Sequence, residues 1–184
     1  MKKNLILFIA ASACCFMTQT LHAQSTPLKG FEYGPVITQF GMHAKVPNVT
    51  LSPETQLKVA FDVAAQGEGG KVNRKFDSLA RFLNMHVAAG VPKQNIKLAL
   101  VVHGKASMDL LEHEIYTKVH QQDNANKALL IELMSNNVAI FLCGQSAAAY
   151  EINHSQLIKG VDVELSAMTA HALLQQQGYT VNPF

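Results

Sequence analysis

Two short apolar runs, each ended by a glycine-containing turn, constrain the fold more than any other feature of this chain. Residues 96–102 (IKLALVV) and 138–142 (VAIFL) are almost entirely apolar, and they continue into His103-Gly104 and Cys143-Gly144. Runs of this length without polar alternation are typical of parallel strands buried on both faces. The pattern therefore predicts a central sheet that helices cover on both sides.

The rest of the chain alternates between strand and helix patterns. Further strands are predicted at 57–63, 161–165 and 179–181, and helices at about 73–89, 107–120, 124–136, from 145, and 167–177. Such alternation indicates right-handed crossovers and a mainly parallel sheet, whose strands all end at one edge. We expect a three-layer α/β sandwich with about five strands, with Asn73 capping the first helix and Ser146 the helix from 145.

The 184 residues fit one folded domain preceded by two different segments. Residues 24–54 carry proline and glycine too often for a long helix, which predicts an extended arm. Its aromatic residues Phe31, Tyr33 and Phe40 indicate that the arm packs on its own domain or on a neighbouring subunit. The α/β domain itself is expected over 55–184.

Residues 1–23 resemble a secretory signal peptide. Lys2 and Lys3 precede an apolar stretch over 5–16 that is too short to cross a bilayer. Cleavage after Ala23 would release a periplasmic or secreted protein with no stable membrane insertion. An alternative is lipidation of Cys14, because ASAC at 11–14 weakly resembles a lipoprotein cleavage box.

Processing would change both the charge and the cysteine content. The full chain has 15 basic and 13 acidic residues; loss of Lys2 and Lys3 leaves 13 of each, and this balance gives no basic face for nucleic acid. Cys143 would be the sole cysteine left, so no intrachain disulfide could form. A lone cysteine in an exported protein is either a reactive thiol or a buried, inert one.

Three segments should meet at the carboxyl edge of the sheet, where open α/β sheets bind ligands. They are His103-Gly104, Cys143 with its turn, and Ser166 to Thr169. The turn amides of Gly144, Gln145 and Ser146 would stabilise a Cys143 thiolate. If the two apolar strands are neighbours, His103 lies beside the thiol and can assist it. Alternatively, His103 only hydrogen-bonds the turn backbone.

These same segments carry a family resemblance. Residues 101–106 (VVHGKA), 141–146 (FLCGQS) and 166–170 (SAMTA), in this order and spacing, resemble the DsrE/DsrF-like family. The resemblance implies a compact α/β sandwich assembled as a trimer or hexamer. It also implies a sulfur role, since relatives relay a persulfide on a cysteine that position 143 matches, with a sulfur donor or acceptor protein as partner. This chain departs from those cytoplasmic relatives in its export signal and in having no second mature thiol.

We expect neither a metal nor a cofactor. His113 and His120 lie two turns apart on a predicted helix, about 10 Å along its axis, which is too far to share one ion. His86 and His171 fall near apolar helix stripes and are predicted to be core or interface residues. The loop at 67–71 (GEGGK) lacks the spacing of a phosphate-binding loop.

Two functional hypotheses remain from the sequence. In the first, Cys143 is a redox or sulfur-handling thiol assisted by His103, and Gly104 belongs to the same site. In the second, the protein is a non-enzymatic, oligomeric binding module for a small ligand or partner segment, and Cys143 is only a small residue that fits its turn.

Overall fold

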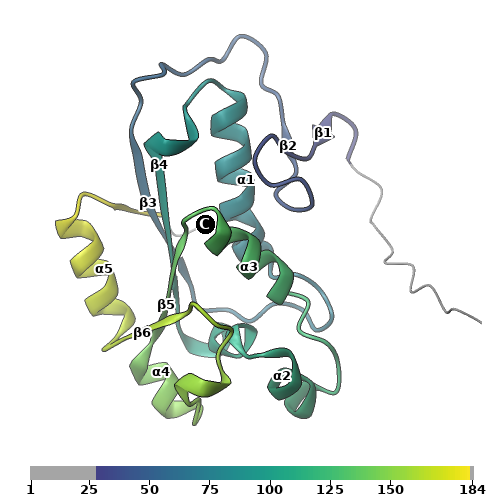
Figure 1. The fold of residues 1–184 in the computed structure, drawn as a ribbon, viewed down its shortest axis with the longest axis vertical. Coiled ribbons are helices and arrows are strands. Elements are labelled where there is room, and N and C mark those ends of the chain that lie inside the picture. Colours follow the sequence, from purple (N-terminus) through teal and green to yellow (C-terminus); the bar gives the residue numbers. More distant parts are fainter. Residues whose placement is uncertain (1–27, 183–184) are drawn as a thin grey trace, which may run out of the picture.

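The computed structural model describes residues 28–182, so the predicted signal segment 1–23 lies outside the described residues. Five parallel strands form the central sheet in the order β6-β5-β4-β3-β7 (Figure 1). Their bounds are β3 Leu57–Val63, β4 Ile96–Val102, β5 Ala139–Cys143, β6 Asp162–Glu164 and β7 Thr180–Asn182. The predicted sheet is therefore confirmed, and β3 and β4 have the bounds predicted for them.

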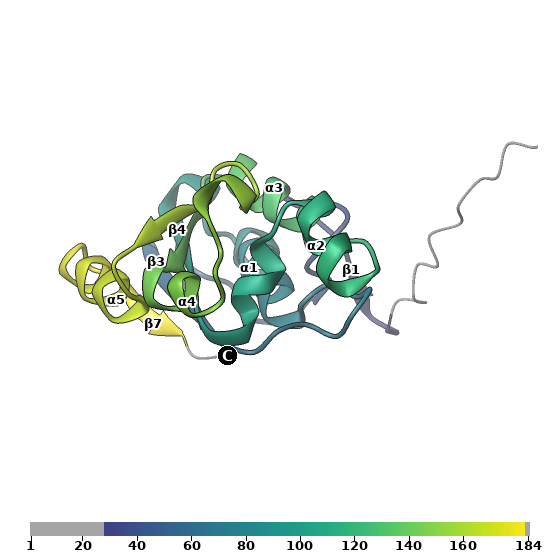
Figure 2. The same ribbon diagram turned by 90° about the horizontal axis from the view of Figure 1, so that it is seen from below.

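Helices cover both faces of the sheet, as predicted. Viewed onto one end of the molecule, α1 and α3 lie on one side of the strands and α5 lies on the other (Figure 2). The helix bounds are α1 Arg74–Ala88, α2 His113–His120, α3 Lys127–Ser135, α4 Gly144–Ala149 and α5 Ala167–Gln176, with 3-10 helices at Lys93–Asn95, Gly104–Leu110 and His154–Gln156. None of the helices within residues 28–182 has the length and apolarity needed to cross a membrane.

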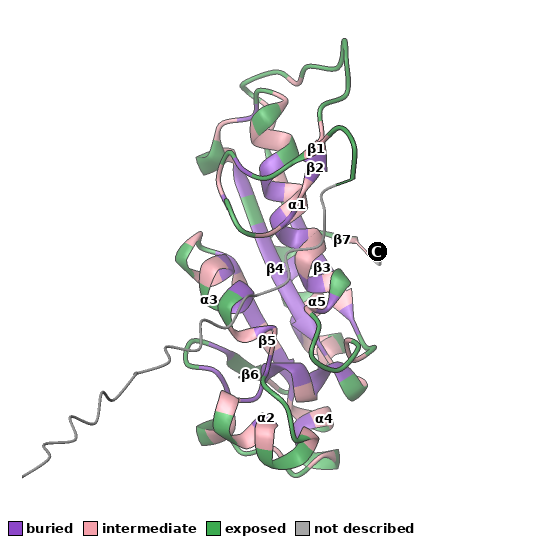
Figure 3. Ribbon diagram, turned by 90° about the vertical axis from the view of Figure 1, so that its right-hand side faces the viewer, coloured by how far each residue is buried: buried purple, intermediate pink, exposed green. Residues whose placement is uncertain are grey.

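The two faces of the sheet differ in the size of their side chains. Large residues such as Phe61, Leu100 and Leu142 point toward α1 and α3 and form the main core. The α5 face is built mostly from small residues, including Ala60, Ala99 and Ala139. Strand β4 is buried along most of its length (Figure 3). Because successive residues of a strand alternate between faces, the size difference follows directly from the sequence.

One predicted helix is wrong. In place of a single helix over 107–120, the 3-10 helix Gly104–Leu110 is followed by an extended residue, Leu111, before α2 begins. Leu111 forms an antiparallel bridge with Leu157, and its carbonyl accepts a hydrogen bond from the buried Asn124 side chain. Pairing with distant parts of the chain outweighs local helix propensity here. Helix α3 also begins at Lys127, later than predicted.

The extended arm packs on its own domain. Two short strands, β1 (Phe31–Glu32) and β2 (His43–Ala44), pair with each other, and between them Ile37 is fully buried in the main core. The buried side chain of Asn84 on α1 holds this loop, because its Oδ1 accepts from the amides of Val36 and Ile37 at 3.1 and 2.9 Å. Its Nδ2 donates to three carbonyls of the loop, those of Ile37, Phe40 and Gly41. One side chain thus provides hydrogen-bond partners for five backbone groups of the loop, which would otherwise be buried unpaired.

We predict that Asn84→Ala lowers the free energy of unfolding by about 2–4 kcal/mol, because buried backbone groups of the loop lose their partner. Urea denaturation would measure the loss. Asn95→Ala is the matched control, since its side chain bonds only the exposed Pro53 carbonyl, and it should cost under about 1 kcal/mol. Equal losses in the two variants would contradict the assignment.

Candidate functional site

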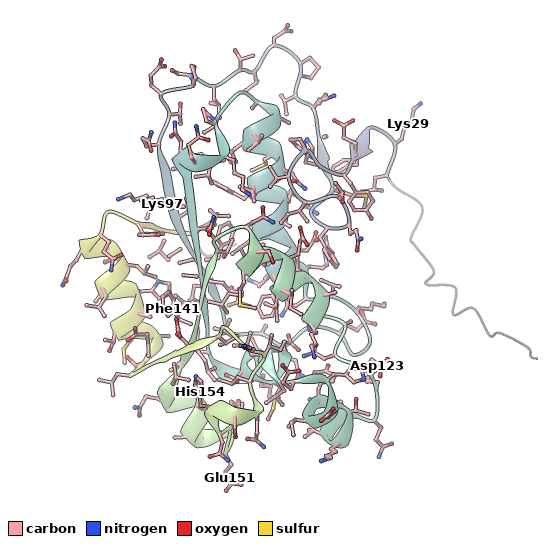
Figure 4. The ribbon with its side chains drawn as sticks, in the orientation of Figure 1. Lys29, Lys97, Asp123, Phe141, Glu151 and His154 are labelled. Carbon is pink, nitrogen blue, oxygen red and sulfur yellow. The ribbon has the colours of Figure 1, made fainter. Side chains whose placement is uncertain are left out.

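Three polar side chains lie on the α5 face at the carboxyl ends of adjacent strands. Asp62 shares its face with Ala60 in β3, and Cys143 shares its face with Ala139 and Phe141 in β5. Val102 pairs with Leu142, so His103 and Cys143 follow at neighbouring positions on the central strands. The predicted adjacency of β4 and β5 is thus confirmed. Figure 4 shows the direction in which the strands run: Lys97, near the start of β4, lies at the opposite end of the molecule from Glu151 and His154, which follow β5.

Cys143 lies where the N-termini of two helices meet. It is the N-cap of α4, and the amide of Ala167 at the start of α5 also reaches it. Ser166 caps α5, with its hydroxyl accepting from the Thr169 amide at 3.0 Å. The cysteine is only 6% exposed and is the free cysteine of the described residues. Backbone N–H groups from the first turns of two helices therefore face one thiol.

Opposing effects act on the pKa of Cys143. Burial raises the pKa, because it penalises the charged form. Hydrogen bonds from the Ser146 hydroxyl and from the amides of Ser146, Ala167 and Gln145 lower it. The hydrogen bonds prevail, and the pKa lies below the ordinary value of a thiol. A lowered pKa increases the fraction of thiolate, which is the nucleophilic form.

Ser146 has a different role from the predicted helix cap. Helix α4 begins at Gly144, and the Ser146 hydroxyl bonds the Cys143 sulfur and accepts from the Gly104 amide at 2.9 Å. A hydroxyl that accepts one hydrogen bond orients its own hydrogen toward another acceptor. The turn after β4 thereby sets the direction in which Ser146 donates to the thiol.

Asp62 binds two histidines at once. Its Oδ2 lies 3.2 Å from His103 Nε2, and its Oδ1 lies 2.8 Å from His171 Nε2 on α5. Burial raises the pKa of Asp62, but the hydrogen bonds from His171 and His103 outweigh burial and hold the pKa below its usual value. An ionised Asp62 thus orients both imidazoles.

A cavity of about 340 Å³ brings these groups together. Its walls contain the thiol, the two histidines, Asp62, Gln145 and the first turn of α5. Met168 lies at its rim and is 80% exposed. The cavity joins a nucleophile, two imidazoles and an anion beside two helix N-termini, an arrangement suited to chemistry on a thiolate.

Comparison with known proteins identifies the family of this chain. A family model described as DsrE/DsrF-like matches residues 58–183, more than half of the chain. The chain belongs to the DsrE/DsrF-like family. No match was found among curated protein sequences.

Two solved structures share the DsrE-like fold. One is the protein of unknown function MTH1491 from Methanobacterium thermoautotrophicum, at 15% identity and a TM-score of 0.53. The other is the ychN protein from E. coli, at 22% identity and a TM-score of 0.50. Each comparison covers 70% of this chain and 100% of the other. At these identities the likeness concerns the fold alone.

The glycines predicted for the site are required by packing. A side chain at Gly144 would meet the Glu164 carbonyl oxygen at 2.7 Å, so β6 can approach the Cys143 turn only if residue 144 is glycine. Gly104 has φ +54°, and a Cβ there would lie 3.0 Å from the Ala64 carbonyl oxygen. Both glycines thus allow the close backbone approach that shapes the edge of the sheet.

His113 and His120 of α2 do not line this cavity. His113 pairs with Asp123 at 3.3 Å, and the His120 ring packs on Tyr116. Within residues 28–182, no group of three or more His, Cys, Asp or Glu residues could hold a metal ion. In the loop at 67–71, the Gly67 amide donates to the buried Asp109 carboxylate.

Sequence reasoning missed Asp62, His171 and the Ala167 amide. His171 was expected in the core or at an interface, yet its Nε2 bonds Asp62 and its Nδ1 is buried without a partner. A signal for Asp62 did exist, because it is the one acidic residue in the strand 57–63 and lies two positions after Ala60. Nothing in the sequence indicates that His171 lies beside a residue 109 positions earlier.

We predict that Ser146→Ala raises the pKa of Cys143, because the thiolate loses a hydrogen-bond donor while its burial remains. The rate of iodoacetamide alkylation, followed against pH, should shift to higher pH and fall about two- to tenfold at pH 7, the effect of one hydrogen bond. Ser135→Ala is the control, since that hydroxyl bonds the Ile131 carbonyl at an exposed position of α3. A wild-type thiol that alkylates only above about pH 8.5, or an unchanged profile in Ser146→Ala, would contradict the prediction.

Proposed function

We propose that this protein is an exported sulfur carrier that holds a persulfide on Cys143. The observation that carries the proposal is the thiol with a lowered pKa at the meeting point of two helix N-termini. Membership of the DsrE/DsrF-like family, which is linked to sulfur relay, supports it. The cavity beside the thiol leaves room for the sulfur atoms of a donor.

The transfer step needs no oxidant or reductant. The Cys143 thiolate attacks the outer sulfur of a donor persulfide, R–S–SH, and a new Sγ–S bond forms as the donor S–S bond breaks. The donor leaves as the thiolate R–S⁻, and Cys143 becomes Cys–S–SH. Amides of Gln145, Ser146 and Ala167 that stabilise the thiolate also stabilise a persulfide anion. An acceptor thiol reverses the step.

His103 and His171 are proposed to manage protons during this exchange. Both imidazoles line the cavity that contains the thiol, and Asp62 accepts a hydrogen bond from each. With Nε2 donating to Asp62, Nδ1 of a neutral imidazole is an acceptor. The Nδ1 of His171 is buried and has no hydrogen-bond partner among the described residues. It is therefore a proposed acceptor for the proton of an incoming persulfide.

Intact mass spectrometry of protein purified from its own compartment without reductant tests the carrier proposal. We expect a chain beginning at Gln24 that carries a 32 Da adduct, absent from Cys143→Ser and removed by dithiothreitol. Sulfinic acid adds nearly the same mass but resists this reduction. When the purified proteins are treated with polysulfide in vitro, a persulfide should form on the wild type and not on Cys143→Ser. If polysulfide leaves Cys143 unmodified, the carrier proposal is wrong. The same mass spectrum tests export: a chain that retains residues 1–23, or that carries a lipid on Cys14, would overturn the proposed cleavage after Ala23.

We further propose that the chain assembles into a trimer or hexamer through the surface formed by β6 and α5. Four apolar side chains are exposed there, namely Val163, Leu165, Met168 and Leu173. Neighbouring exposed apolar residues favour burial against another copy. Because Met168 lines the rim of the cavity, such contacts would also narrow access to Cys143.

Multi-angle light scattering tests this surface. Met168→Glu should reduce the mass of the assembly, because a buried carboxylate in an apolar contact is unfavourable. Val119→Glu is the control, since Val119 is an exposed residue of α2. A monomeric wild type, or an assembly that Met168→Glu leaves intact, would refute this interface.

The low exposure of Cys143 favours one alternative, a non-enzymatic binding module in which this cysteine is structural. In that case Cys143→Ala would retain binding of the natural ligand or partner segment, and polysulfide would not modify the wild type. The mass experiment therefore separates the two functions.

A further inference from the structure

A second cavity, of about 550 Å³, lies at the far end of the sheet from the thiol, between residues 43–51 and the last turns of α1. Both ends of this segment are held to α1: Arg81 Nε donates to the Met42 carbonyl at 2.9 Å, and the Leu51 amide donates to the Ala89 carbonyl at 2.8 Å. Figure 1 shows the chain running from β2 past the C-terminal end of α1. The segment thus spans the hollow between two points at which it is hydrogen-bonded to the α1 region.

The wall of this cavity is mainly apolar, and its one lysine, Lys45, is paired with Glu32 at 3.0 Å. Its larger apolar residues are Val46, Val49, Leu51 and Met85. The ionisable residues in the wall are His43, Lys45 and His86, and no aspartate or glutamate lines it. Such a lining suits a ligand with an apolar body and one anionic or accepting group.

His43 provides the specific anchor. Its side chain lines the cavity, is 2% exposed, and has no hydrogen-bond partner for either ring nitrogen. In every protonation state an imidazole carries at least one N–H. An unpaired buried donor is unfavourable, so a ligand that accepts from it removes an existing penalty. His86 cannot offer Nδ1 in the same way, because that atom already bonds the Phe82 carbonyl at 2.7 Å.

We propose that this cavity binds a small amphiphilic carboxylate, such as a medium-chain fatty acid, with the carboxylate accepting from His43 and the chain against Val49 and Met85. The volume lies within the range of about 300–1,000 Å³ that is usual for small-molecule sites. Both His43 nitrogens are buried, so the proposal includes an outward movement of residues 45–50 when the carboxylate binds. The site is independent of the sulfur-carrier proposal, since it shares no residue with the Cys143 cavity.

Isothermal titration calorimetry with decanoate, decan-1-ol and decyltrimethylammonium tests the ligand class. We expect decanoate to bind at least about tenfold more tightly than decan-1-ol, the difference that a charge-assisted hydrogen bond produces. Decyltrimethylammonium should bind most weakly of the three. Equal affinity for the three amphiphiles, or no binding of decanoate, would overturn the proposal.

Two variants locate the site. His43→Phe should weaken decanoate binding about tenfold while leaving the melting temperature of the empty protein unchanged or higher, because it removes unpaired buried nitrogens; a purely structural histidine would lower that temperature. Met85→Glu places a carboxylate at the half-exposed rim and should also weaken binding about tenfold, whereas Val119→Glu on α2 should not. Unaltered binding in both cavity variants overturns the proposal. Self-association that Met85→Glu abolishes, without decanoate binding, would instead assign the cavity to a second copy.

Discussion

The parallel register of β3, β4 and β5 is the constraint on which the rest of this structure depends. Pairing of Val63 with Val102, and of Val102 with Leu142, brings the ends of the three strands to one level. Alternation of side chains then assigns Asp62 and Cys143 to the same face as the alanines that contact α5. A shift of one residue in any of these strands would move its functional side chain into the main apolar core.

Much of this arrangement could be predicted from the sequence. The strands 57–63 and 96–102 were predicted with their correct bounds, the first from its alternating pattern and the second from its apolar run, and each ends at a loop. The proximity of His103 and Cys143 followed from one assumption, that their strands are neighbours, and the pairing of β4 with β5 confirms it. Local pattern and topology together therefore identified the edge of the sheet and two of its residues.

Other features depend on contacts between distant residues, which no local pattern indicates. The sequence shows His171 only as a histidine near an apolar stripe, and its bond to Asp62 exists only once α5 packs on the sheet. Ser146 was predicted as a helix cap because it is a serine near a helix start. Helix α4 begins at Gly144, two residues before Ser146, and the Ser146 hydroxyl instead connects the Gly104 amide to the thiol. Leu111 interrupts a predicted helix for a similar reason, its bridge to Leu157.

The alanines beneath α5 have a further consequence for how the molecule opens. Ala60, Ala99 and Ala139 let α5 approach closely but give it little apolar area to bury, whereas α1 packs on phenylalanine and leucine. The free energy needed to detach α5 from the sheet is therefore lower than the free energy needed to detach α1. Since α5 carries both His171 and the Ala167 amide, its detachment would remove two groups from the thiol in a single event. The hydrogen bonding and burial of the Cys143 thiol are thus tied to the docking equilibrium of one helix.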